Sequence, residues 1–125
     1  MNVPNNLKYT KDHEWLKVEG NTGFVGITDF AQSELGDIVF VDIAADVNEI
    51  SAGNSFGTIE AVKTVSELFA PCDGKVLEIN PKLQDEPQLI NSDAYGDGWI
   101  LKIEIANSAQ VNELLSDEDY SKLIS

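Results

Sequence analysis

The sequence predicts a single, mainly β domain of the sandwich or barrel type with a few short helices. Several short runs rich in β-branched and aromatic residues recur along the 125 residues, and turn-forming residues separate most of them. A chain of this length can bury a real core in one domain, and we see no low-complexity linker that would divide it. Two helical patterns near the C-terminal end complete the expected set of elements.

The first half of the chain is expected to form a hairpin, a helix and a strand. The hairpin pairs 15–19 with 24–27 around the turn GNTG, whose glycines and asparagine tolerate positive φ. The helix begins after Thr28 as N-cap and ends at Gly36. Its inner face is expected to hold three apolar residues, Phe30, Ala31 and Leu35. The β-branched run 38–43 is the most strand-like segment of the sequence, and a connection at 47–50 and a turn follow it.

In the second half, the extended runs within 57–71 predict a hairpin with Lys63 at its tip. Strands are expected at 75–80 and 99–105, with an irregular segment between them that has room for one short helical turn. Two helices end the chain, and Ser116 is expected to cap the second. The first of these helices carries Val111, Leu114 and Leu115, and we expect core packing for the apolar stripe of the second, Tyr120, Leu123 and Ile124.

Composition argues against several classes of partner. The chain has 22 acidic and 8 basic residues and a net charge of -14, with carboxylates spread along its whole length. Nucleic acid and anionic membranes are disfavoured, because no cluster of lysine and arginine is present to bind phosphates. No apolar stretch approaches the roughly 20 residues of a membrane span, and the first residues lack the pattern of a signal or transit peptide. A single cysteine, Cys72, makes an internal disulfide impossible and fits a reducing compartment.

The sequence contains little that would support a conventional catalytic site or a metal site. His13 is the only histidine, so a serine or cysteine nucleophile would depend on it, and no motif supports either arrangement. We expect a hydrogen-bonding role for His13 and a partly buried turn position for Cys72. One histidine and one cysteine do not make a zinc site, and the acidic loop with Asn91, Asp93 and Asp97 lacks the spacing of a calcium loop. We therefore expect no catalytic residue and no metal.

Lys63 is the residue that remains. The hairpin centre lacks the Asn-Gly or Asp-Gly pair that makes a two-residue turn easy, and apolar residues flank the lysine. A solvated lysine in a turn is the ordinary alternative. Exposed apolar groups around one charge instead indicate a recognised surface. An amine with a pKa near about 10.4 is a poor nucleophile alone but a good acceptor for an enzyme that joins an activated acid to it.

A set of motifs gives the chain a resemblance to a known family. In order they are His13-Glu14-Trp15, GITDFAQ at 26–32, LGDIVFV at 35–41, Glu60-Ala61-Val62-Lys63, AP at 70–71, GKV at 74–76, LINSD at 89–93 and YGDGW at 95–99. Their order and spacing resemble the H proteins of the glycine cleavage system over 7–123. Departures from the family pattern include Thr64, Ala61, Ala94 and Cys72.

The resemblance implies a fold and a cofactor. The fold would be a barrel-sandwich hybrid, a flattened β-barrel or sandwich with a few short helices including the C-terminal ones, and 1–125 would be one lipoyl-carrier domain. Lipoate would be attached covalently to Lys63 by a lipoate ligase or by a lipoyl or octanoyl transferase. Glu60, Val62 and Thr64 would take part in recognition of the hairpin.

The resemblance also implies a non-catalytic carrier in glycine catabolism and one-carbon metabolism. Its arm would take an aminomethyl group from glycine decarboxylase (P protein) to the folate-dependent aminomethyltransferase (T protein). Dihydrolipoyl dehydrogenase (L protein) would then reoxidise the dithiol. We expect a monomer in the bacterial cytoplasm, or in the mitochondrial matrix if the source is eukaryotic. We further hypothesise that carboxylates hold the protonated amine of the loaded arm, with Glu14 first and then Glu67 and Asp12.

Other readings stay open at this point. An H-like protein acting as a lipoate donor or relay would carry the same motifs. A lipoyl domain of a 2-oxo acid dehydrogenase commonly has aspartate before the modified lysine, where this chain has Val62. A biotin carrier would have methionine beside the lysine, and an acidic interaction domain would leave Lys63 unmodified.

Overall fold

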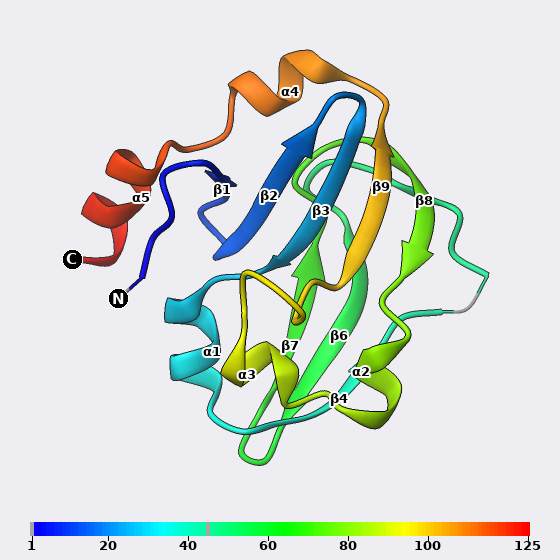
Figure 1. Ribbon diagram of the computed structural model, residues 1–125, viewed down its shortest axis with the longest axis vertical. Coiled ribbons are helices and arrows are strands. Elements are labelled where there is room, and N and C mark those ends of the chain that lie inside the picture. The colour runs from blue at the N-terminus through cyan, green and yellow to red at the C-terminus, as the bar shows by residue number, and fades with distance from the viewer. Residues whose placement is uncertain (1, 45) are drawn as a thin grey trace.

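The computed structural model describes residues 2–44 and 46–125 and contains two antiparallel sheets with short helices around them (Figure 1). The larger sheet has the strand order β1-β2-β3-β9-β8-β5 and the smaller one the order β4-β6-β7. The strands of the larger sheet are Lys8–Tyr9, Glu14–Glu19, Thr22–Ile27, Leu101–Ile105, Gly74–Ile79 and Glu49–Ile50, in that order. Those of the smaller sheet are Ile38–Asp42, Ser55–Ala61 and Val65–Phe69. The prediction of a mainly β sandwich is confirmed, and over the described ranges the two sheets do not close into a barrel.

Most predicted strands are present, with differences at their ends. The first turn is limited to Gly20 and Asn21, because β2 and β3 continue their pairing up to Glu19 and Thr22. Gly20 has a φ of 64°, a conformation that glycine adopts without strain. The expected connection at 47–50 contains β5, which pairs with β8. Pairing of this kind joins residues far apart in the chain, so local sequence does not reveal it.

The helices are short and well capped where the sequence indicated. Helix α1 (Asp29–Leu35) begins at Thr28, whose hydroxyl accepts a 3.2 Å hydrogen bond from the Ala31 amide, and Gly36 ends it with a φ of 82°. Helix α5 begins at Ser116, whose hydroxyl accepts from the Asp119 amide. The segment expected to hold one helical turn holds two helices. After α1, the helices in chain order are α2 (Lys82–Asp85), α3 (Leu89–Ser92), α4 (Ser108–Asn112) and α5 (Asp117–Ile124).

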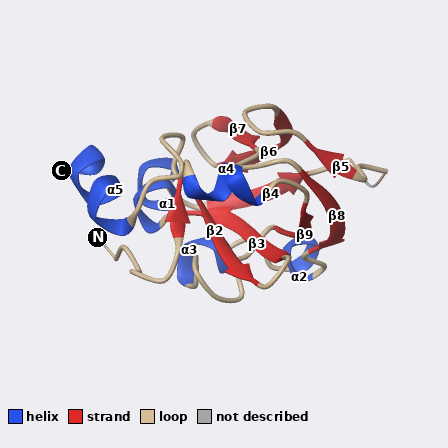
Figure 2. Ribbon diagram, turned by 90° about the horizontal axis from the view of Figure 1, so that it is seen from above, coloured by secondary structure: helices blue, strands red, loops and turns tan. Residues whose placement is uncertain are grey.

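The main core lies between the two sheets, and a second cluster lies beside α5. Tyr9, Trp15 and Tyr120 are fully or almost fully buried in this second cluster, and the Tyr9 and Tyr120 rings stack at 4.7 Å. Figure 2 shows α5 at the margin of the molecule, beside the N-terminus. Leu123, expected in the core, is half exposed because α5 stands at this margin. Cys72 is fully buried, not partly buried, because it packs into the main core.

Gly26 is required by the packing of Trp15. The two residues are opposite each other in the β2–β3 pair, and a Cβ added to Gly26 would lie 2.6 Å from the indole. The indole cannot move easily, because its Nε1 donates a 3.0 Å hydrogen bond to the Ala94 carbonyl. We expect Gly26→Ala to lower the free energy of unfolding by about 1–3 kcal/mol in urea titrations.

Gly23→Ala, in the same strand, is the matched control for this prediction. Its Cβ would meet the end of the Leu16 side chain at 2.8 Å, and that end can rotate away. We expect a clearly smaller loss of stability than for Gly26→Ala. Equal losses for the two variants would contradict the role assigned to the indole.

Candidate functional site

Lys63 is the middle residue of the three-residue connection 62–64 at the end of the β6–β7 hairpin, which projects from the bottom of the molecule in Figure 1. The Ala61 amide donates a 2.8 Å hydrogen bond to the Thr64 carbonyl and closes the loop. The Val62 amide donates to the Asp37 carbonyl at 3.1 Å, which ties the loop to the chain between α1 and β4. Outside glycine, His13 alone has a positive φ among the described residues, so the loop is neither a type I′ nor a type II′ turn. A glycine-free sequence can therefore form it.

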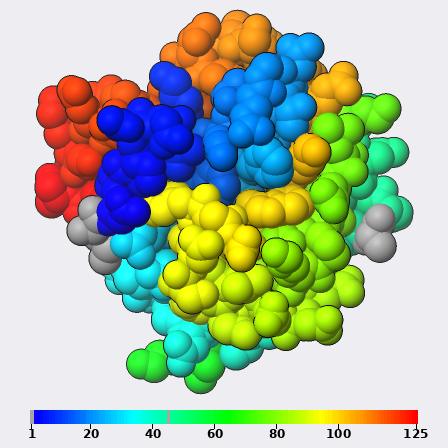
Figure 3. All heavy atoms as spheres, in the orientation of Figure 1, coloured from blue at the N-terminus to red at the C-terminus, as the bar shows by residue number. Residues whose placement is uncertain are grey.

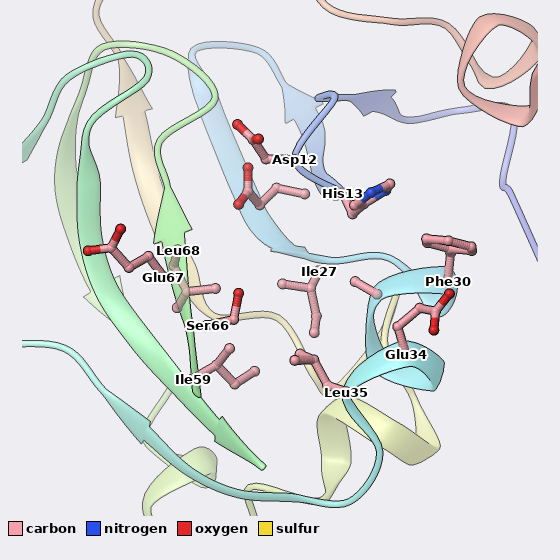
Figure 4. Close-up of a pocket in the computed structure, with 12 residues that line it drawn as sticks. Asp12, His13, Ile27, Phe30, Glu34, Leu35, Ile59, Ser66, Glu67 and Leu68 are labelled. Carbon is pink, nitrogen blue, oxygen red and sulfur yellow. The ribbon is translucent and has the colours of Figure 1, made fainter. Parts of the chain in front are cut away.

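A cavity of about 260 Å³ lies beside this hairpin, between β7, α1 and the start of β2 (Figure 4). The hairpin itself supplies one wall through Ile59, Ser66 and Leu68. Most of the lining is apolar, and four carboxylates also line it. The residues contributed by the other elements are Asp12, His13, Glu14, Ile27, Phe30, Ala31, Glu34 and Leu35.

Glu14 is the buried acid of the cavity. Its side chain is on β2, only 2% of the residue is exposed, and both carboxylate oxygens accept hydrogen bonds. The Thr10 hydroxyl donates to one oxygen at 2.9 Å and the Phe69 amide to the other at 3.1 Å. Burial raises the pKa of Glu14 to about 7, although these two hydrogen bonds oppose the rise. The cavity thus offers an acid poised to ionise near neutral pH, and an entering cation would favour its charged form.

The other predicted site residues lie at the rim or outside the cavity. Asp12 and Glu67 are exposed residues of the cavity lining. In Figure 4 the Glu67 side chain points to the opposite side of β7 from Ser66 and Leu68, as strand alternation requires. Glu60 is exposed on the outer face of the smaller sheet, opposite Val65, and so is not part of the cavity lining.

Val62 and Thr64, also predicted as recognition residues, are exposed beside Lys63 at the tip, Val62 to 70%. Thr64 contributes its carbonyl to the hairpin. Its β-branched side chain, a departure from the family pattern, leaves this backbone bond in place.

Sequence reasoning missed His13, Glu34 and Ser66 as lining residues. Glu34 had a detectable signal, since it lies four residues after Phe30 and so shares a helix face with it. Ser66 shares a strand face with Leu68, but the position of the cavity depends on packing between sheets.

His13 is held by a partly buried hydrogen-bond network that joins three segments. Its Nδ1 lies 2.8 Å from the Tyr120 hydroxyl, and that hydroxyl lies 2.7 Å from the hydroxyl of Thr28. The Thr28 amide donates to the His13 carbonyl at 3.0 Å. Burial lowers the pKa of His13, while nearby Asp12 and Glu34 oppose the shift. The network fixes a residue with a φ of 69° at the cavity wall and confirms the hydrogen-bonding role expected for His13.

We expect Tyr120→Phe to lower the free energy of unfolding by about 1–3 kcal/mol, because it removes the shared partner of His13 and Thr28. Denaturant titration measures this loss. Tyr9→Phe is the matched control, since the Tyr9 ring stacks on Tyr120 but its hydroxyl donates only to the Pro4 carbonyl. A Tyr120→Phe loss no larger than the Tyr9→Phe loss would contradict the importance of the network.

Comparison with known proteins gives the decisive observation. The family model described as "Glycine cleavage H-protein" matches residues 7–125. This chain belongs to the glycine cleavage H-protein family. Members of the family are the lipoyl-carrying subunits of the glycine cleavage system. The match sets aside the alternative of a 2-oxo acid dehydrogenase lipoyl domain.

Two relatives extend the family match over nearly the whole chain. A glycine cleavage system H protein of Carboxydothermus hydrogenoformans is 57% identical over 122 residues, covering 98% of this chain and 94% of the relative. The crystal structure of a glycine cleavage system H protein from Mycobacterium marinum superposes with a TM-score of 0.87 at 38% identity. That match covers 96% of this chain and 97% of the other. The H-protein fold is therefore shown by sequence and by structure.

Two further observations bear on what the family member binds. Among the described residues, no group of three or more histidine, cysteine, aspartate or glutamate side chains is arranged to hold a metal ion. Within the same ranges, no helix is both long and apolar enough to cross a membrane.

Proposed function

We propose that lipoate is attached covalently to Lys63 and that this chain carries the resulting arm among the enzymes of the glycine cleavage system. One observation carries the proposal: an exposed lysine ends a hairpin whose inner face forms the wall of a cavity with a buried carboxylate. In this proposal residues 1–125 act as one carrier domain.

The cavity fits such an arm along its length. Ser66 is three residues from Lys63 and Phe69 is six, so the hairpin wall extends from about 10 Å to about 20 Å from the tip. Ile59, Leu35 and Ile27 offer an apolar surface, and Asp12 lies beyond them in Figure 4. Glu14 accepts its hydrogen bond from Phe69, at the far end of this path. An arm folded back from Lys63 would meet apolar groups first and carboxylates last.

The lipoyl group, when bound, supplies a sulfur that accepts the aminomethyl group from glycine. Glu14, in its ionised form, would pair with the ammonium end of this cargo inside the cavity. Glu67 and Asp12 would add negative charge at the rim. Glu60, Val62 and Thr64 surround Lys63 at the exposed end, where an attaching enzyme would recognise the hairpin.

The proposed partners follow from membership in the system. This chain would accept the aminomethyl group at glycine decarboxylase, deliver it to the aminomethyltransferase and return to dihydrolipoyl dehydrogenase as the dithiol. It would catalyse none of these steps and would act as a monomer, raising the effective concentration of its cargo at each active site. A lipoate ligase or a lipoyl or octanoyl transferase would load it. We place it in the bacterial cytoplasm, since the named relatives are bacterial.

Loading and turnover can be tested in one sequence of experiments. The unmodified protein is incubated with a lipoate–protein ligase, lipoate and ATP, and the product is measured by intact mass and peptide mapping. We expect one lipoyl increment on the Lys63 peptide and, after loading, glycine-dependent release of carbon dioxide with glycine decarboxylase. An increment on another lysine, or a loaded protein that the decarboxylase does not use, would contradict the proposal.

A further inference from the structure

The smaller sheet exposes apolar side chains on the face that points away from the cavity. Phe40, Glu60 and Val65 are opposite one another across β4, β6 and β7, so their side chains share this outer face. Phe40 is 49% exposed and Val65 57% exposed. Val39 adds a third exposed apolar group beside Phe40. We call these four residues the outer patch.

A β-bulge in β4 places Val39 and Phe40 on the outer patch together. Ile38 pairs with Ala61 and Phe40 with Glu60, so Val39 is an extra residue in β4. In a regular strand, one of two successive side chains would turn towards the core. Here both are exposed, and the strand is an edge of its sheet. Apolar groups on an open edge carry a risk of aggregation unless a partner uses them.

The outer patch is adjacent to the loop that carries Lys63. The Ile38–Ala61 pair separates the Phe40–Glu60 pair from the tip, and Val62 donates its hydrogen bond to Asp37, just before β4. Figure 3 shows the green tip at the lower edge of the molecule, beside the cyan residues that lead towards β4. A protein that encloses the lysine from this side therefore has to contact the outer patch.

The charges of the sheet indicate the chemistry of that protein. The charged residues of β4, β6 and β7 are Asp42, Glu60 and Glu67, all acidic. Glu60 lies between the apolar groups Phe40 and Val65. The complementary surface is apolar and presents at least one arginine or lysine opposite Glu60.

The distance from Lys63 at which each enzyme acts indicates which enzyme uses the outer patch. An enzyme that acylates Nζ must bring its reaction centre to a side chain only four methylene groups long, so its surface must contact the residues around Lys63. An enzyme that acts at the far end of the loaded arm is separated from the tip by the added length of the acyl chain. The outer patch, only a few residues from the tip, therefore fits the acylating enzyme best.

We propose that the outer patch is the docking surface for the enzyme that acylates Lys63. The inference rests on the proposed function of Lys63 and adds Val39, Phe40 and Val65 to its recognition site. In the ligase reaction the lipoate carboxylate attacks the α-phosphate of ATP, the α–β phosphoanhydride bond breaks, pyrophosphate leaves and an acyl-adenylate forms. The lysine nitrogen forms an amide bond to the acyl carbon, the bond from that carbon to the phosphate oxygen breaks, AMP leaves and the protons of the amine pass to solvent.

The experiment compares acylation rates of matched pairs of variants. Phe40→Thr and Val65→Thr change the outer patch and place at each position a β-branched residue, which strands favour. Leu77→Thr and Val18→Thr make similar changes at residues 48% and 41% exposed on the larger sheet. A lipoate–protein ligase, lipoate and ATP are used, and intact mass follows the reaction. We expect kcat/KM to fall about tenfold for Phe40→Thr and about threefold for Val65→Thr, mainly through KM, and to stay unchanged for both controls.

A second measurement separates the attaching enzyme from the other partners. Each variant is loaded to completion by prolonged incubation and then assayed for glycine-dependent carbon dioxide release with glycine decarboxylase. Activity within twofold of the wild type supports a surface used for attachment. Equal acylation rates for Phe40→Thr and the wild type would overturn the assignment of the outer patch as the docking surface and leave the proposed function of Lys63 intact. Loss of decarboxylase activity together with normal acylation would have the same meaning. Wild-type protein that gains no lipoyl group at Lys63 would overturn the proposed function as well.

Discussion

Lys63→Arg is expected to abolish carrier activity, with at least about a 100-fold loss of glycine-dependent carbon dioxide release. Arginine keeps the positive charge, but its guanidinium stays protonated and does not accept the acyl group. Without a tethered arm, the effective concentration of cargo at the partner active sites is lost. The measurement uses equal amounts of wild-type and variant protein after treatment with ligase, lipoate and ATP.

Lys75→Arg is the matched control for this prediction. Lys75 is an exposed lysine on β8 of the larger sheet, so it tests the same substitution away from the hairpin. We expect full acylation and full activity for Lys75→Arg. Thermal unfolding should be unchanged for Lys63→Arg, since Lys63 is exposed in its loop. Normal activity of Lys63→Arg would mean that another residue carries the arm.

Glu14→Gln is expected to stabilise the unloaded protein at high pH. The pKa of Glu14 is raised to about 7 in the folded state, from 4.5, because its carboxylate is buried. Between these values the folded state binds more protons than the unfolded state, so stability falls as pH rises towards 7. Glutamine removes this dependence; its Oε1 can accept the hydrogen bond from the Phe69 amide, while its Nε2 faces the Thr10 hydroxyl as a donor. The stability difference between variant and wild type should grow by about 2 kcal/mol from pH 5.5 to pH 8.5.

Glu67→Gln is the control for the loss of one negative charge. Glu67 is exposed at the cavity rim, so we expect its replacement to change stability by less than about 0.5 kcal/mol at either pH. Urea titrations at pH 5.5 and 8.5 measure both variants. A Glu14→Gln difference that does not change with pH would show that the carboxylate is not the buried acid described here.

The same Glu14→Gln variant should hold its cargo poorly. The ionised carboxylate pairs with the ammonium group in the proposed loaded state, and a neutral amide does not. We expect the loaded variant to release formaldehyde and ammonia about tenfold faster than the wild type at pH 7.5. Release no faster than from wild-type protein would contradict the proposed role of Glu14, and Glu78→Gln, at an exposed carboxylate on β8 outside the cavity lining, serves as control.

Local patterns in the sequence predicted the elements whose signals are local. The Thr28 cap, the Gly36 stop and the hairpin around Lys63 depend on residues within a few positions of one another, and the structure contains all three. The resemblance to a family led to the prediction that Lys63 carries lipoate, and Glu14 was hypothesised as the first of the carboxylates that hold the arm. The resemblance did not reveal that Glu14 is buried, because that depends on a Phe69 amide 55 residues further along the chain.

The bulge at Val39 and the pairing of β5 with β8 escaped prediction for a related reason. Residues 38–43 alternate too little to show which side chains face the core, so the run was simply strand-like. The register with β6, which inserts Val39, is fixed by contacts with Ala61 and Glu60. Residues 49–50 are too few to show a period, and their partner lies at 74–75.

The hydrogen bond from Val62 to the Asp37 carbonyl has a mechanical consequence. Lys63 is fixed to a loop that is itself braced against the body of the protein, so its Cα acts as a stationary pivot. In the proposed carrier, all the travel of the cargo would then come from rotations within the arm, which would sweep a small, fixed volume around one point. A looser loop would enlarge that volume and dilute the cargo within it. With the Cα of Lys63 held in place, the cavity and a bound partner enzyme would both lie within one arm length of the same point.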